Sequence, residues 1–125
     1  MKHQFIGTLI FLIFSGSVQA EAPFIEHGNG FFTEQIPLKS CLSQGEKVFK
    51  DLGITLKKST NPKNEVVGFQ KDYKVVLYCI SDEGGCDEPE GEYASGGTVI
   101  VAGAEYAKTN RLVQDIVADM KLQQN

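Results

Sequence analysis

Residues 73–80, Tyr-Lys-Val-Val-Leu-Tyr-Cys-Ile, carry the most decisive pattern in this chain. Because side chains alternate along a strand, Tyr73 and Cys79 share one face with the apolar residues between them, while Val76 and Ile80 lie on the other. Both faces are apolar, which is typical of a strand in the interior of a sheet. The segment therefore predicts a central strand, with Cys79 on one of its covered faces.

Weaker patterns on both sides of this segment predict further strands. Short apolar runs with β-forming residues are expected to form strands at 31–38, 54–57, 66–69 and 98–102. Residues typical of turns, mainly Ser, Asn, Pro, Lys-Asp and Gly, separate these runs.

Two longer segments have apolar residues at helical spacing. The first is expected to begin with Ser40 as its N-cap and to end at Leu52, because Gly53 is a typical C-terminal stop. Its stripe consists of Cys41, Leu42, Gly45, Val48, Phe49 and Leu52. The second segment, 105–122, has a similar stripe and is expected to form the last helix.

The predicted order of elements is a strand, a helix, three to four strands and a helix. This order indicates an α+β fold in which two helices pack on one face of a mainly antiparallel sheet of four to five strands. Residues 31–122 are expected to form this single domain. Residues 21–30 are expected to be a flexible lead-in, because Pro23 and the Gly28-Asn29-Gly30 run break regular structure.

Residues 1–20 have the composition of a secretory signal peptide. Basic Lys2 precedes an apolar run, 5–14, and small residues lead up to Ala20, the predicted cleavage position. The run is too short for a bilayer-spanning helix, which needs roughly 20 apolar residues. We therefore expect a periplasmic or secreted protein of bacterial type, with no stable membrane insertion after cleavage, in a compartment that permits disulfides.

Three cysteines allow one disulfide and leave one thiol over. Cys41 lies on the stripe of the first helix and Cys79 on a covered face of the central strand, so these two are the favoured pair. Closing that loop stabilises the fold by about 4 kcal/mol in the chain-entropy model, against about 2.5 kcal/mol for a Cys79–Cys86 loop. Pairing of Cys79 with Cys86, pairing of Cys41 with Cys86, and three free thiols remain alternatives.

The residues give little support for catalysis, a cofactor or a metal. Cys41 at a helix start could be a reactive thiolate, but His27 is the one histidine after the leader and no base accompanies the cysteine. A single histidine does not make a zinc site. We predict no catalytic residue, no cofactor and no metal ligand set.

Charge is distributed unevenly along the chain, whose net charge is −4. Residues 81–93 contain six acids and no base, whereas residues 39–74 contain eight lysines against four acids. The six acids are Asp82, Glu83, Asp87, Glu88, Glu90 and Glu92. They lack the spacing of a calcium-binding loop, and the dispersed lysines do not suggest nucleic acid as a partner.

The pattern of elements and cysteines in this chain resembles that of small exported bacterial proteins of an uncharacterised domain family. The similarity covers about 31–122 and rests on residues 37–41, the Leu52-Gly53 stop, Val67-Gly68, residues 73–79 and residues 99–103. It implies a signal peptide, a cysteine on the first helix and a cysteine on a strand, and no established activity. The segment around Cys86 is longer than this pattern.

Together these features favour an exported binding protein without enzymatic activity, resembling an inhibitor or an immunity protein. The acidic segment 81–93 is its expected contact with a basic protein partner, because acidic segments can dock on basic grooves. The alternative is a binding protein of the bacterial envelope for a small ligand or a divalent cation. The pattern predicts no oligomeric state.

Overall fold

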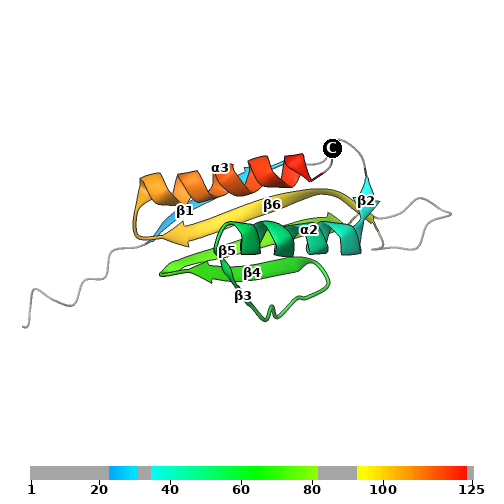
Figure 1. Ribbon diagram of the computed structural model, residues 1–125, viewed down its shortest axis with the longest axis horizontal. Helices are drawn as coiled ribbons and strands as arrows, with labels where there is room; N and C mark the ends of the chain where they lie inside the picture. The colour runs from blue at the N-terminus through cyan, green and yellow to red at the C-terminus, as the bar shows by residue number, and fades with distance from the viewer. Residues whose placement is uncertain (1–22, 31–34, 82–92, 124–125) are drawn as a thin grey trace, which may run out of the picture.

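A computed structural model describes residues 23–30, 35–81 and 93–123 of the chain. These residues form two helices and six strands, in an order with one strand more than expected before the first helix (Figure 1). The elements are β1 (Phe24–Asn29), β2 (Ile36–Pro37), α2 (Leu38–Asp51), β3 (Thr55–Lys57), β4 (Glu65–Gln70), β5 (Tyr73–Ser81), β6 (Tyr93–Gly103) and α3 (Tyr106–Leu122).

The strands form one antiparallel sheet. Its order is β1-β6-β5-β4-β3, and the short β2 also pairs with β6. β5 lies in the middle, with Val76 opposite Val67 of β4 on one side and Ile100 of β6 on the other. The predicted α+β class, antiparallel sheet and central strand are therefore confirmed, although the sheet has six strands instead of four to five.

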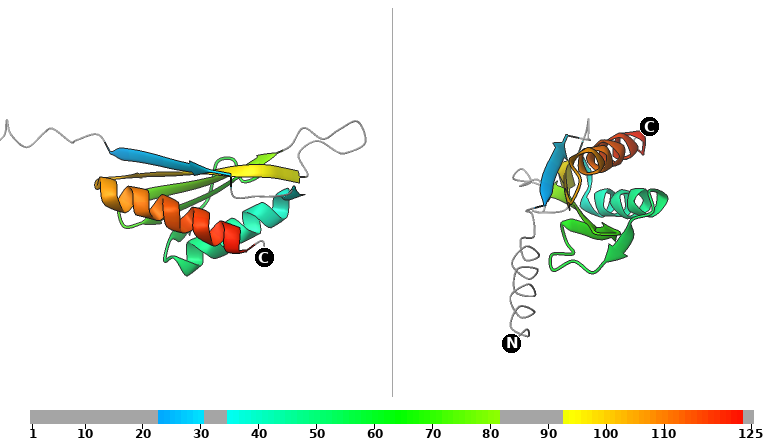
Figure 2. Two further views of the ribbon diagram at one scale, coloured as in Figure 1. Left: turned by 90° about the horizontal axis from the view of Figure 1, so that it is seen from above. Right: turned by 90° about the vertical axis from the view of Figure 1, so that its left-hand side faces the viewer.

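Both helices pack on the same face of the sheet (Figure 2). The core between them contains the odd-numbered residues of β5 from Tyr73 to Cys79, which are buried, and their neighbours Val99 and Val101 on β6. Even-numbered residues of β5 lie on the opposite face, where Ile80 and Ile100 are exposed. The sheet thus has one covered face and one face that no described element covers.

α2 contributes the predicted stripe to this core. Four of its members are buried, and Leu42 and Leu52 are partly buried against them. The helix begins at Leu38, whereas a cap at Ser40 would start it three residues later at Cys41, so Ser40 lies inside the helix and does not cap it. Pro37 occupies the N-cap position, where its fixed φ suits a helix start and no side-chain cap is present. Gly53, with φ of +74°, ends the helix as predicted.

The lead-in expected at 21–30 is wrong for most of its length, because Phe24–Asn29 form strand β1. β1 pairs with β6 along its whole length, from Phe24 opposite Gly103 to Asn29 opposite Thr98. Of the strand expected over 31–38, residues 31–34 lie outside the described residues; in 35–38 the strand comprises Ile36–Pro37, and the expected end is wrong because Leu38 already belongs to α2. Residues 1–20, the predicted signal peptide, lie outside them too.

Candidate functional site

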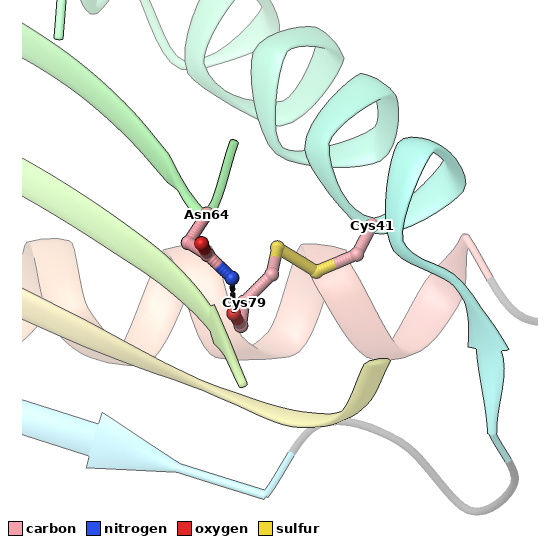
Figure 3. Close-up of a disulfide and its surroundings, with 3 residues drawn as sticks. All are labelled: Cys41, Asn64 and Cys79. Atoms are coloured by element: carbon pink, nitrogen blue, oxygen red, sulfur yellow. Dashed lines mark hydrogen bonds between the residues drawn. A yellow bond between two sulfur atoms is a disulfide. The ribbon is translucent and has the colours of Figure 1, made fainter. Parts of the chain in front are cut away.

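A disulfide joins Cys41 of α2 to Cys79 of β5 (Figure 3). The two Cα atoms are 6.3 Å apart, and both cysteines are fully buried. This confirms the favoured pairing and excludes the alternatives in which Cys41 or Cys79 pairs with Cys86, which lies outside the described residues. It also removes Cys41 as a nucleophile, because a disulfide sulfur is not a thiolate.

Asn64, the turn residue just before the neighbouring strand β4, bonds to the backbone of Cys79 (Figure 3). The Cys79 amide donates to the Asn64 carbonyl at 2.7 Å, and the Asn64 side-chain amide donates to the Cys79 carbonyl at 3.3 Å. Asn64 is one of the turn residues expected before the strand at 66–69, and the sequence pattern does not indicate these two hydrogen bonds. The short polar side chain at the start of β4 therefore fixes the half of the disulfide that belongs to the sheet.

The six acids proposed as the partner-binding residues lie at 82–92, outside the described residues. The ends of that segment are described: Ser81 is the last residue of β5, and Tyr93 is the first of β6. Ser81 pairs with Ala94 after a register shift that follows Ile80. The segment is thus joined to the two longest strands, and one end is two residues from the disulfide.

A groove of about 600 Å³ opens at the same end of the molecule. It lies between the start of α2, the turn before β4 and the first residue of β6. Its walls are mostly apolar, and two lysines add positive charge; the lining includes Leu38, Leu42, Pro62, Tyr93, Lys39 and Lys63. No acid belongs to the described lining. Because these residues come from three distant parts of the chain, the sequence pattern did not reveal the groove.

Metal-ligating residues do not gather within 23–30, 35–81 and 93–123. No group of three or more His, Cys, Asp or Glu side chains in these ranges could hold an ion. His27, expected in a loop, is an exposed residue of β1. It therefore has no partner cysteine or carboxylate cluster with which to form a site there.

Comparison with known proteins identifies no relative: no family model, no curated protein and no solved structure matches the chain. Within the part of the chain that the structure describes, neither helix is long and apolar enough to cross a bilayer.

Proposed function

We propose that this chain is an exported, non-enzymatic binding protein that engages a basic protein partner through the acids of residues 82–92, as an inhibitor or immunity protein does. The observation that carries the proposal is the attachment of this segment. Six carboxylates without a base are inserted between the two longest strands of the sheet, beside a buried disulfide.

This attachment favours binding for two physical reasons. Fixed ends reduce the conformational freedom that a segment loses when it binds, so less of the interaction energy is spent on ordering. A dense negative charge also accelerates encounter with a positive surface and disfavours acidic competitors. The faster encounter and the discrimination against acidic competitors should both weaken as the salt concentration rises, because the screening length is only about 8 Å at physiological ionic strength.

Export is part of the same proposal. A disulfide is typical of oxidising compartments, and the Cys41–Cys79 bridge is compatible with cleavage of the predicted leader after Ala20 and release into the periplasm or the medium. N-terminal sequencing of the natural product tests this directly: Glu21 as the first residue is expected, and an intact leader contradicts it.

The binding proposal is tested by removing the six charges and nothing else. A variant with Asp→Asn and Glu→Gln at positions 82, 83, 87, 88, 90 and 92 should lose the protein that crosslinks to the wild type in an envelope extract at low salt. Mass spectrometry with isotope labels quantifies the captured protein, which is expected to be basic.

A matched control neutralises the same number of acids elsewhere, at Glu46, Asp51, Asp72, Glu105, Asp115 and Asp119. It changes the net charge equally and should retain capture. The proposal fails if the wild type enriches no partner, if the first variant captures as well as the wild type, or if the control loses as much.

The groove favours a second candidate, binding of a small amphipathic anion. Its apolar walls would cover a hydrocarbon body, and Lys39 and Lys63 could bind a carboxylate or phosphate head. Calorimetry with decanoate tests it: the Lys39→Gln/Lys63→Gln variant should bind at least ten times more weakly, while Lys71→Gln/Lys74→Gln should bind normally. Absence of heat, or equal affinity in both variants, contradicts this candidate.

Binding of a divalent cation is the other part of the small-ligand alternative, and fewer observations support it. Since the described residues contain no cluster of ligands, it depends wholly on the acids at 82–92. Titration with calcium should then produce heat and raise the melting temperature of the wild type alone, and neither effect should occur in the six-acid variant. A silent titration of the wild type dismisses it.

A further inference from the structure

β1 forms one edge of the sheet and differs from the other edge, β3. β1 is six residues long and pairs only with β6, so its other side has no partner among the described residues. β3 has three residues, and Lys57 and Lys58 stand at its end. Lysines and short length are the usual means by which proteins protect an edge. β1 lacks both.

The backbone groups that β1 leaves open can be assigned. Beyond the end of β1, the Gly30 amide donates to the Gly97 carbonyl at 3.2 Å. In an antiparallel ladder, bonded and non-bonded pairs alternate. Gly28 and Glu26 therefore bond to β6, and the N–H and C=O groups of Ile25, His27 and Asn29 point away from the sheet. This edge thus presents three donors and three acceptors.

The surroundings of this edge are largely apolar and uncharged. Ile25 is 64% exposed, and Phe24, 46% exposed, makes an edge-to-face contact with Tyr106 of α3 at 6.0 Å between ring centres. A Cβ at Gly28 would come within 3 Å of Val113 and Val117, so α3 lies directly over β1.

The flank of α3 on the β1 side is uncharged from Tyr106 to Val117. By helical spacing, Asn110 and Gln114 lie on this flank, and the Gln114 amide bonds to Asn110. The charged residues Lys108, Arg111 and Asp115 lie on the opposite flank, where they line a shallow groove with Leu52 and Gln70. Another helix can therefore approach α3 from the β1 side without burying a charged side chain of residues 106–117.

We infer that a second copy of this chain pairs with β1, giving a two-fold symmetric dimer whose sheet runs continuously through both molecules. The two β1 strands are antiparallel, with Ile25 opposite Asn29 and His27 opposite the same residue of the other copy. This register joins all six outward groups of each strand reciprocally, which a self-complementary interface requires. It also sets Glu26 against Gly28, so the Glu26 carboxylates of the two copies are not directly opposite each other.

The neighbouring registers are worse for identifiable reasons. Moving one strand so that Ile25 faces His27 places Glu26 against Glu26 and Asn29 against Pro23, which has no N–H to donate. Moving it the other way leaves Ile25 beyond the end of the partner strand. Only the central register uses the edge fully, and this favours an identical strand over an unrelated peptide.

The helices tolerate this arrangement. α3 packs on both β1 and β6 in each copy. With strands about 4.8 Å apart, two helices so placed lie about 10 Å from each other. Packed helices are separated by about 8–10 Å, so the two α3 helices would meet through their uncharged flanks without clashing.

Crosslinking tests the register. In full-length protein expressed with its own leader and carrying Cys86→Ser, His27→Cys should double the mass under mild oxidation, since facing residues are about 5.5 Å apart at Cα. Ile25→Cys should remain single, because two copies of that residue lie about 14 Å apart in this register. The Ile25→Cys/Asn29→Cys variant should double again.

A second variant tests the edge hydrogen bonds without new thiols. His27→Pro removes one outward N–H and leaves the β1–β6 bonds intact, while His27→Ala removes only the imidazole. Sedimentation should show a dimer for the wild type and His27→Ala, and a monomer for His27→Pro with a native circular dichroism spectrum. The inference is overturned if the wild type is monomeric at millimolar concentration, or if the Ile25→Cys control crosslinks as readily as His27→Cys.

Discussion

α2 and α3 lie on the same face of one sheet, yet they are attached to it by different means (Figure 2). α2 is joined to the central strand by a buried covalent bond. α3 is held to the sheet mainly by packing, with Leu112, Val113, Ile116 and Met120 buried. One hydrogen bond, from Lys47 to Gln123 at 3.1 Å, joins α2 to the residue after α3. The disulfide half should therefore resist local opening, and the α3–β1 half should open first.

Removing the disulfide should have the largest effect on this difference. The Cys41→Ala/Cys79→Ala variant should lose about 4 kcal/mol of unfolding free energy, because the bridge closes a loop of 37 residues. Urea denaturation followed by circular dichroism measures it. Cys86→Ser serves as the control and should change stability by less than about 0.5 kcal/mol. A loss below about 1 kcal/mol in the double variant would mean that packing, not the bridge, fixes α2.

Truncating a buried side chain of α3 should have the second-largest effect on the free energy of unfolding. Ile116 is fully buried, so Ile116→Ala should cost about 3 kcal/mol through lost burial and the cavity left behind. Native-state hydrogen exchange should show α3 and β1 amides losing protection while those of α2 and β5 keep most of theirs. Equal loss of protection in both halves would show that the two helices open as one unit.

Filling the space between β1 and α3 should have a smaller effect. Gly28→Ala places a methyl group within 3 Å of Val113 and Val117, and overpacking of this kind costs about 1–3 kcal/mol. Gly96→Ala is the matched control, since its Cβ would meet nothing within 4 Å. Thermal melting compares them. Adding Val113→Ala to the Gly28→Ala variant should raise its melting temperature, because the smaller side chain makes room for the new methyl group. Val113→Ala alone should not raise the melting temperature of the wild type, and a rise there would contradict this account.

The smallest expected effect concerns the surface of the α3 half. The Lys108 ammonium lies 4.6 Å from the centre of the Tyr73 ring, a cation–π contact worth about 0.5 kcal/mol at an exposed site. Lys108→Gln should therefore lower the unfolding free energy by about that amount in urea titrations. Lys50→Gln, on α2, should cause no comparable change. Equal losses would mean that removing one positive charge, and not the contact with Tyr73, lowers the unfolding free energy.

The core of the fold could be predicted because it depends on periodicity. Alternation in 73–80 and the stripe from Cys41 to Leu52 both identify residues that the structure buries. Once those two faces are known to pack against each other, Cys41 and Cys79 are expected to form the disulfide, because both lie in the same core. The helix start was misplaced because Ser40 resembles a cap, whereas the local backbone at Pro37 decides where the helix begins.

β1 could not be predicted from local pattern. Its residues include Gly28 and Asn29, which are typical of breaks, and it has no apolar alternation because Glu26 and Gly28 occupy positions on the face that α3 covers. Gly28 is required there by the closeness of α3, a contact that joins residues 85 positions apart in the sequence. The candidate groove was missed for the same reason, since Leu42, Lys63 and Tyr93 meet only in the folded chain.

If the chain is exported as proposed, the position of the bridge also bears on its maturation. Cys41 and Cys79 are consecutive cysteines, and the ring they close contains β3, β4 and most of α2 and β5. In a chain translocated from its N-terminus, both thiols emerge before Cys86, so an oxidase that joins cysteines in order of arrival makes the native bond without an isomerase. Among the described strands, β1 would then emerge first and would have no neighbour to pair with until β6 follows, nearly seventy residues later.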